Sequence, residues 1–414
     1  MAEFDSSINT EVSEAPYIAR PNRNDGETRV NKLIEFKQSI RSQLSDDVSV
    51  TLFWKGRVAL YVILKALGIA EGDEVIVPGL TCVVVPNAVI YSGATPIYAD
   101  VDPSTYTLSP ESVEPLITPR TRAIVAQNTF GLSADLDLIL DLAKKKGIEV
   151  IDDCTHGFGG TYKDKPNGSV TRVSFFSTQW NKPFSTGIGG FAVTTDAALA
   201  EKFQRFEDDA IRPSFKEVAA LRSLYFARRT LMRESTYWPL LRAYRWLSAK
   251  NLVIGSSQGE ELESPRMPDG FLKGLSAFQA KVGVGALREL EDSVRFRQAV
   301  AAEYDQVLSE LGKSIPFRPD YASHPFLKYP VRVSRRDEFM QAAEADRVRL
   351  GEWFNSPLHP IQGDLSPWGY RSGGCPVAEE AARELVNLPT DPDMSRGEVD
   401  RVKEFVRSHA EYFL

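Results

Sequence analysis

The chain has 414 residues, of which 43% are hydrophobic and 25% are charged, a composition typical of a globular protein large enough for two domains. Its formal net charge of −7 gives no sign of a nucleic-acid partner, and none is expected. Three cysteines, Cys82, Cys154 and Cys375, are too few and too scattered for a disulfide framework or a cysteine zinc site, so no metal is expected either. The first residues contain no apolar signal core, and we therefore expect a cytoplasmic protein.

The first half of the chain predicts an α/β domain. Residues 1–28 are polar and predict a flexible N-terminal arm, or one that docks on a partner subunit, and the apolar spacing over 30–44 predicts a helix. From residue 48 onward, strand-like and helix-like segments alternate, which is typical of an open and mostly parallel sheet that binds ligands at the carboxyl ends of its strands. The strands are predicted at 50–53, 74–77, 95–98, 123–125, 149–152 and 172–176, and the helices at 56–67, 86–92, 109–116 and 135–145.

The second half predicts helices and a smaller domain. Residues 199–250 are predicted to be largely helical, 255–270 to form a loop, and 277–311 to form one long amphipathic helix. We therefore assign 29–260 to a large domain and 261–414 to the long helix and a smaller C-terminal α+β domain. The small domain is predicted to contain a strand at 330–333 and helices at 336–346 and 399–405.

The segment 216–250 interleaves arginines with large aromatic residues. One interpretation is an inserted helical region that packs on its own core or on a partner subunit. A second is weak peripheral binding to an anionic membrane surface, because arginine and tryptophan on an amphipathic helix favour that interface. A third is substrate gating. The sequence leaves the three open.

Lys182 is the first candidate catalytic residue. Most lysines are solvated surface charges, but this one has hydroxyl residues on both sides and is followed by Gly187-Ile188-Gly189-Gly190, which allows the backbone to approach a ligand closely. An amine in a pocket wall has a lowered pKa and can form an imine. This pattern favours Schiff-base chemistry with pyridoxal 5'-phosphate, with Lys182 as the imine-forming residue.

Asp153 is the second candidate, because Asp152 and Asp153 end a β-branched run about thirty residues before Lys182. A carboxylate buried at the carboxyl edge of a core strand needs a cationic partner, which the pyridine nitrogen of the cofactor would supply. Alternate residues of a strand face opposite ways, so one acid is chosen, and we favour Asp153. Alternatively, Asp152 and Asp153 are solvated or cap the N-terminus of a helix. His156 follows, either as a contact of the cofactor ring or as a core histidine.

Gly56 and Arg57 open a predicted helix directly after a strand, and the backbone amides of a helix start bind anions. Many α/β helices begin in this way, so the pattern is weak by itself. Together with Ser177, whose hydroxyl can donate to a phosphate, it predicts the phosphate-binding part of the cofactor site.

A set of motifs in a fixed order carries a family resemblance over roughly residues 50–405. The motifs include Gly56-Arg57-Val58-Ala59-Leu60, Gly72-Asp73-Glu74-Val75-Ile76-Val77-Pro78, Asp153…His156, Ser177…Lys182, Gly187-Ile188-Gly189-Gly190 and Pro357-Leu358-His359-Pro360. The chain thereby resembles the DegT/DnrJ/EryC1/StrS aminotransferases. The resemblance implies the aspartate-aminotransferase-like fold (fold type I), a homodimer with shared active sites, and transfer of an amino group from a glutamate-like donor to a keto group, usually on a nucleotide-linked sugar.

The same resemblance assigns roles by position. Lys182 matches the imine lysine, Asp153 the partner of the pyridine nitrogen, His156 a ring contact and Ser177 a phosphate ligand. His359 matches a residue of the substrate pocket, with packing in the small domain as its alternative.

Four departures from the family pattern accompany the matches. Lys55-Gly56-Arg57 replaces Ser-Gly-Thr, Cys82 replaces a ring-stacking aromatic, and Asn128 replaces a histidine. The Asn-x-Arg motif expected before Gln279-Ala280 is absent. The changed Asn-x-Arg motif keeps a second hypothesis in view, a pyridoxal-phosphate enzyme of elimination or replacement. The Arg/aromatic segment 216–250 keeps a third in view, a catalytically idle, membrane-associated homologue.

Overall fold

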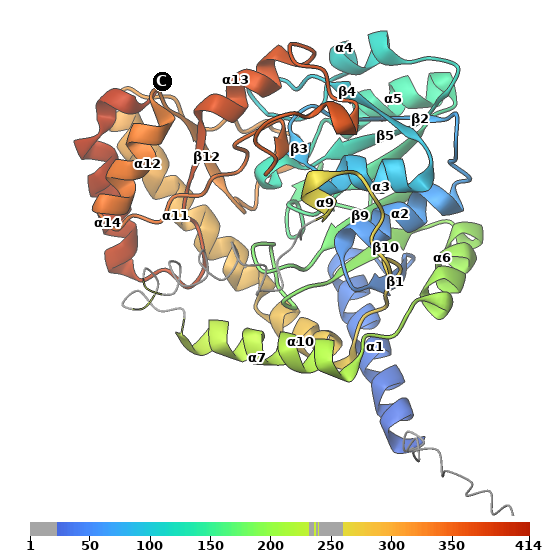
Figure 1. The fold of residues 1–414 in the computed structure, drawn as a ribbon. Coiled ribbons are helices and arrows are strands. Elements are labelled where there is room, and N and C mark those ends of the chain that lie inside the picture. The colour runs from blue at the N-terminus through green and yellow to red at the C-terminus, as the bar shows by residue number, and fades with distance from the viewer. Residues whose placement is uncertain (1–22, 232–235, 237–238, 240–259) are drawn as a thin grey trace, which may run out of the picture.

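The computed structural model describes residues 23–231, 236, 239 and 260–414. At its centre lies a seven-stranded sheet with the strand order β1-β10-β9-β6-β5-β2-β4, surrounded by helices (Figure 1). Its strands are β1 (Ser49–Phe53), β2 (Glu74–Pro78), β4 (Thr95–Ala99), β5 (Thr121–Gln127), β6 (Glu149–Asp153), β9 (Val173–Ser177) and β10 (Gly190–Thr194). The predicted α/β architecture is therefore confirmed, while β10 is a strand that the sequence analysis did not predict.

The direction of the strands brings two candidate residues to one edge. β9, β6, β5, β2 and β4 are parallel neighbours, whereas β10 is antiparallel to β9 and to β1. Asp153 ends β6 and Ser177 ends β9, and Asp153 lies opposite Phe175 in the pairing of these strands. Because parallel strands end at the same edge, the two side chains meet where such folds bind ligands.

The helices of the large domain follow the prediction closely, with differences at two places. They are α1 (Arg23–Leu44), α2 (Gly56–Ala66), α3 (Val84–Ser92), α4 (Pro110–Val113), α5 (Leu136–Lys146) and α6 (Ala197–Asp209). α1 begins at Arg23, inside the range expected to be an arm, and residues 1–22 lie outside the described part. The helix predicted at 109–116 is α4 followed by a 3-10 turn at Glu114–Leu116, because Pro115 lacks the N–H that would continue an α-helix.

The single helix predicted at 277–311 is two helices. α10 (Ala277–Arg288) ends at Glu289, whose backbone leaves the helical conformation at φ −97° and ψ 0°, and α11 (Leu290–Glu310) follows. α10 packs on α1 in a core of the large domain, and a Cβ on Gly283 would lie 2.3 Å from the ring of Phe36. The C-terminal part of α11 instead packs in the core of the small domain through Tyr304 and Leu308. Because of this break, α10 packs in the core of the large domain and α11 reaches the core of the small domain.

The small domain has a two-stranded antiparallel sheet, β12 (Tyr329–Arg332) and β14 (Leu385–Leu388). α11, α12 (Arg336–Ala345) and α14 (Arg396–Ser408) lie beside it, in the orange and red part of Figure 1. β12, α12 and α14 confirm predicted elements, whereas β14 and α13 (Pro376–Glu384) were not predicted. The remaining short strands are β3 (Thr81–Cys82), β7 (Thr161–Tyr162), β8 (Lys165–Pro166), β11 (Ala322–Ser323) and β13 (Leu358–His359).

The helical region after α6 is interrupted at residues 210–214, which precede α7 (Phe215–Leu231). Leu221 of α7 is buried in a cluster with Trp54 and Ile188, so this part of the 216–250 segment packs on the protein's own core. On its other side α7 leaves Phe215 88% exposed and Phe226 50% exposed. Most of 232–250 lies outside the described residues.

One short helix lies within the segment 255–270, which was predicted to be a loop. This helix, α9 (Glu260–Glu263), rests against α3, because Asn87 Nδ2 donates a hydrogen bond of 3.2 Å to the carbonyl of Glu261. No helix in the described ranges is both long and apolar enough to cross a membrane.

Candidate active site

Lys182 lies in a loop that connects β9 to β10 and is closed by its own hydrogen bonds. Thr178 N–H donates to Gly189 O and Thr186 N–H donates to Thr178 O, both at 2.9 Å, and the hydroxyls of Thr178 and Thr186 are 2.7 Å apart. A Cβ on Gly189 would lie 2.2 Å from the hydroxyl of Thr178, so only glycine fits there. The glycine run thus holds the lysine loop tightly, as the sequence analysis expected of a pocket wall.

The surroundings of the Lys182 amine lower its basicity. Lys182 lines a cavity together with Asp153, His156 and Cys82. The pKa of Lys182 is lowered to about 8, mainly by burial and in part by the charge of Lys328, against the opposing effects of Cys82 and Asp153. A substantial fraction of this amine is therefore neutral and nucleophilic near neutral pH.

The two acids at the end of β6 face opposite sides. Asp153 lines the cavity, and its carboxylate accepts a 3.0 Å hydrogen bond from the Thr155 N–H. Asp152 points away from the cavity and accepts from Asn128 Nδ2 at 3.2 Å and from the Gly168 N–H at 3.1 Å. Burial raises the pKa of Asp153, so its charge needs a cationic partner in the cavity. Of the two, Asp153 is the acid that can meet a ligand.

His156 also lines the cavity and is 4% exposed. Its imidazole stacks on the indole of Trp353 with 4.7 Å between ring centroids, and its Nδ1 is buried with no hydrogen-bond partner among the described residues. Burial, reinforced by Lys182, lowers the pKa of His156 well below its ordinary value, so the ring is neutral. A buried ring nitrogen without a partner next to Lys182 is a position for a contact with a bound molecule.

Gly56, Arg57 and Ser177 also line the cavity. Gly56 is the first residue of α2, as predicted, and a Cβ there would lie 2.9 Å from the Cβ of Ser177. The α2 amides and the Ser177 hydroxyl therefore lie close enough to share one anion. The Arg57 side chain pairs with Glu261 of α9, with Nη1 and Oε1 2.6 Å apart, and Lys55 Nζ lies 3.8 Å from the same carboxylate.

His359 reaches the cavity from the small domain because β13 pairs in parallel with β3, which sets His359 opposite Cys82. Asn355 Oδ1 lies 2.8 Å from His359 Nδ1 and fixes the ring. Burial, together with the charges of Lys182 and Arg336, lowers the pKa of His359 to about 4. All seven residues singled out from the sequence, namely Lys182, Asp153, His156, Ser177, Gly56, Arg57 and His359, thus line one cavity.

Three further residues of this site carried no sequence signal. Trp353 lies under the amine of Lys182, with Nζ 4.8 Å from the ring centroid, and Lys328 Nζ lies 5.5 Å from the same ring. Glu261 is 3% exposed and neutralises Arg57. The need of a buried arginine for an acidic partner was predictable, but the identity of that partner depends on the packing of α9.

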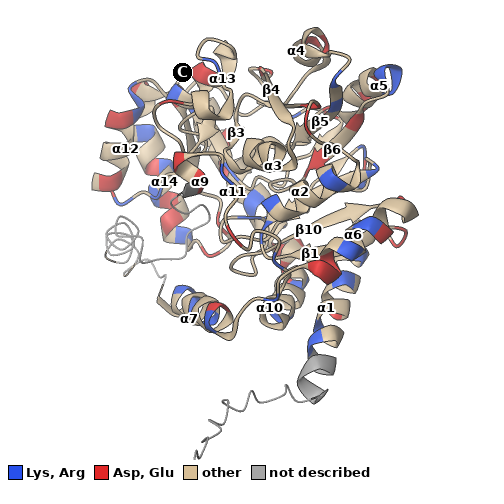
Figure 2. Cartoon of the chain, turned by 45° about the vertical axis from the view of Figure 1, so that its right-hand side comes forward, with Lys and Arg blue, Asp and Glu red and all other residues tan. Residues whose placement is uncertain are grey.

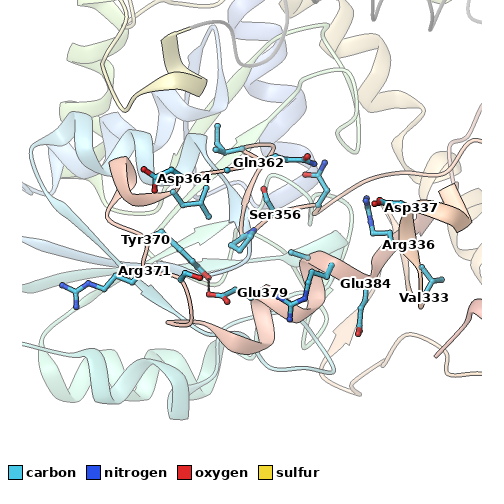
Figure 3. A pocket seen from close by; sticks show the side chains of 18 of the residues that line it. Val333, Arg336, Asp337, Ser356, Gln362, Asp364, Tyr370, Arg371, Glu379 and Glu384 are labelled. Atoms are coloured by element: carbon cyan, nitrogen blue, oxygen red, sulfur yellow. Dashed lines mark hydrogen bonds between the residues drawn. The ribbon is translucent and has the colours of Figure 1, made fainter. Parts of the chain in front are cut away.

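A second and larger cavity of about 1160 Å³ lies in the small domain, between α12, α13 and the segment 355–372 (Figure 3). Arg336, Asp364 and Glu379 are among the charged residues that line it. Asn355 lines this cavity and also holds His359 of the first one. The two cavities are therefore separated by the segment that carries Asn355 and His359.

The residues of the Lys182 cavity fit pyridoxal phosphate. The α2 amides next to Ser177 suit a phosphate, Asp153 suits a protonated ring nitrogen, and the unpartnered Nδ1 of His156 suits a polar atom of the ring. Among the described residues, no group of three or more His, Cys, Asp and Glu side chains is arranged to hold a metal ion.

An α/β sheet with a lysine in a cavity at its carboxyl edge is typical of enzymes that bind a cofactor or substrate through a Schiff base to lysine. A model of the DegT/DnrJ/EryC1/StrS aminotransferase family matches residues 19–234 and 248–407, and the protein belongs to this family. It is an aminotransferase. The resemblance seen in the sequence motifs is thereby confirmed.

Individual relatives agree with this assignment. GDP-perosamine synthase of Caulobacter vibrioides is 30% identical over 357 residues, which cover 84% of this chain and 82% of that protein. A UDP-2-acetamido-2-deoxy-3-oxo-D-glucuronate aminotransferase of Pseudomonas aeruginosa is 27% identical over 94% of this chain and 91% of its own. Among solved structures, DesV of S. venezuelae in complex with a ketimine intermediate superposes with a TM-score of 0.72 at 26% identity, over 92% of this chain and 89% of that one.

Proposed function

We propose that this protein is a pyridoxal-phosphate-dependent aminotransferase that moves an amino group from a glutamate-like amino acid to a keto group on a nucleotide-linked sugar or a related biosynthetic intermediate. The observation that carries the proposal is that Lys182 and Asp153 line one cavity together with the α2 N-terminus. When bound, pyridoxal phosphate supplies an aldehyde that takes up the amino group and a ring that accepts electrons.

Lys182 is the residue proposed to attach the cofactor and to move protons. With a pKa of about 8, its amine is partly neutral at physiological pH, so Nζ can accept a proton from the substrate carbon and return it. The ring of Trp353, 4.8 Å from Nζ, limits the positions that the amine can take and excludes water from that side.

Asp153 and the phosphate-binding residues are proposed to orient the cofactor. The Asp153 carboxylate holds a proton on the ring nitrogen, and the Thr155 N–H fixes that carboxylate in place. The amides at Gly56 and Arg57 and the hydroxyl of Ser177 bind the phosphate. His156 and His359 both line the cavity, and His156 is proposed to contact the ring and His359 the substrate.

The proposed acceptor rests on the relatives. Perosamine synthases, an oxo-glucuronate aminotransferase and a dehydro-glucosamine aminotransferase are all named for amino sugars. L-glutamine:scyllo-inosose aminotransferase of Streptomyces griseus, 33% identical over 70% of this chain and 60% of its own, is named for a cyclitol, which is why related intermediates are included. A homodimer with shared active sites and a cytoplasmic location complete the proposal.

The test is attachment of the cofactor to Lys182. The purified protein with pyridoxal phosphate should show a visible absorption band that L-glutamate changes, and reduction with borohydride should fix the cofactor on the peptide that contains Lys182. Lys182→Ala should lose turnover and the label, whereas Lys145→Ala, at an exposed position on α5, should keep both. Full turnover by Lys182→Ala, or a label on another lysine, would contradict the proposal.

A further inference from the structure

A third cavity, the basic chamber, is also lined by Lys182. Its volume is about 620 Å³, and its walls come from the Lys182 loop, α7, α11 and the small domain. Lys182 and the segment that starts at Lys328 border this chamber, and Trp353 of the cofactor cavity lies beside the amines of both lysines. The two spaces therefore share Lys182 as a lining residue.

The chamber is rich in positive charge. Its described walls carry six cationic and three acidic side chains. The cations are Lys182, Arg228, Arg229, Arg297, Lys328 and Arg349, and the acids are Glu289, Asp391 and Asp393. Arg349 pairs with Glu398, at 2.7 Å, and on the described walls the cations outnumber the acids by six to three. Such an imbalance inside a concave wall attracts anions.

Arg297 stands at the floor of the chamber and is 5% exposed. Its Nη1 and Nη2 both lie 3.3 Å from the carbonyl of Pro183, next to Lys182, and its Nε is buried with no hydrogen-bond partner within the described part of the chain. Leaving a buried guanidinium group partly unpaired costs free energy. An anionic ligand in the chamber would supply the missing acceptor.

α7 forms the outer wall (Figure 2 shows Lys and Arg along this helix). Arg228 lies 5.2 Å from the ring of Trp180 and donates a 3.2 Å hydrogen bond to Asn181, the residue before Lys182. It lines the chamber together with Asp391 of the small domain. Lys328, Arg297, Arg349 and Arg228 hold the pKa of Asp391 below its usual value, against the opposing effect of burial. α7 thus adds charge to the wall of this chamber.

We propose that this basic chamber is a second substrate subsite, which binds a negatively charged oxygen-bearing group of a molecule that reacts at Lys182. The inference rests on the proposed function, since both substrates of that reaction carry such groups: the side-chain carboxylate of a glutamate-like donor and the phosphates of a nucleotide-linked acceptor. Arg228 and Arg229 are the residues that α7 contributes to this subsite.

The test compares two double variants of α7 in the cofactor-loaded protein. Arg228→Gln/Arg229→Gln removes two charges from the chamber, whereas Lys216→Gln/Arg222→Gln removes two charges from the same helix away from it. All four positions are exposed, so both variants should fold. The single variant Arg229→Gln separates the chamber charge from the contact of Arg228 with Trp180 and Asn181.

Two probes distinguish the source of the anion. If the chamber takes phosphates, UDP and pyrophosphate bind the wild type by calorimetry, and the Arg228/Arg229 variant binds them about tenfold more weakly or worse, as expected for lost charge-assisted hydrogen bonds. If the chamber takes the donor carboxylate, the Arg228/Arg229 variant needs about tenfold more L-glutamate than the wild type for a half-maximal change of the cofactor band. The L-glutamine concentration for the same change stays as in the wild type, because the side chain of glutamine is uncharged. The control variant behaves as wild type in both arms.

The inference is overturned if the Arg228/Arg229 variant and the control are alike with UDP, with pyrophosphate and with L-glutamate. It is equally overturned if the wild type binds neither phosphate probe and L-glutamate is unaffected. If no amino donor changes the cofactor band of the wild type, the proposed function fails instead, and the calorimetric arm still decides whether the chamber binds phosphates.

Discussion

The indole of Trp353 lies 4.7 Å from the imidazole of His156, with 13° between the two ring planes, although one residue belongs to the small domain and the other follows β6 of the large domain. The same indole lies 4.8 Å below the amine of Lys182. One aromatic side chain therefore joins the two domains at the point where the reaction is proposed to occur, and it covers the amine of Lys182 on one side.

Replacing Trp353 with alanine should lower kcat/KM roughly 3- to 30-fold, the factor expected from loss of one cation–π contact of about 0.5–2 kcal/mol. Trp353→Phe should keep most of the activity because an aromatic face remains over Lys182. Steady-state kinetics on both variants checks this prediction. Equal losses in the two would show that indole-specific packing, rather than an aromatic face, is what the site requires.

Asp153→Asn should reduce kcat by roughly 10²- to 10⁴-fold, the range associated with one positioned acid–base group, because a neutral amide cannot hold a proton on the ring nitrogen. Asp152→Asn is the matched control. That side chain faces Asn128 and Gly168 instead of the cavity, so the change should lower the free energy of unfolding by about 1–3 kcal/mol and leave kcat of the folded protein within a few-fold. Steady-state kinetics and denaturant unfolding together distinguish the catalytic role proposed for Asp153 from the structural role of Asp152. A larger loss of kcat in Asp152→Asn than in Asp153→Asn would assign the cofactor contact to Asp152 instead.

The reactivity of Lys182 should depend on pH with a midpoint of about 8, because burial lowers its pKa from the ordinary 10.5. Only the neutral amine is nucleophilic, so the rate at which cofactor-free protein binds pyridoxal phosphate should rise with pH through this midpoint and then level off. Lys328 lowers the same pKa, and Lys328→Gln should therefore move the midpoint upward. Stopped-flow absorbance between pH 6 and 10 measures both. A wild-type midpoint near 10 would show that the amine is solvated.

His359→Gln should raise the KM of one substrate about tenfold while the cofactor band stays unchanged, because His359 lines the cavity from the small-domain side. Asn355→Ala should have a smaller effect in the same direction, since it removes the 2.8 Å contact that orients the ring. His409→Gln, at the end of α14, serves as the control. An unchanged KM in His359→Gln would assign this histidine to packing.

The parts of the site that the sequence predicted are the local ones. Asp153, Ser177 and the start of α2 at Gly56 all follow predicted strands, and parallel strands must end at one edge of the sheet. The choice of Asp153 over Asp152 followed from the alternation of a strand, and the structure places only Asp153 in the cavity. The single helix predicted over 277–311 was wrong, because the structure breaks it at Glu289 between α10 and α11. The two halves contact different cores, and one amphipathic pattern does not show which core each half contacts.

By itself the sequence therefore determined the family, most of the sheet and the choice of Lys182 and Asp153 as candidate site residues, because short-range patterns of apolar, small and charged residues encode them. Tertiary structure alone decided which distant side chains complete the site. Trp353 and Lys328 come from the small domain, Glu261 from α9 and Arg228 from α7, and each reaches the site only through packing between segments far apart in the chain. Long-range contacts depend on how whole faces fit together, and no local spacing of residues records that fit.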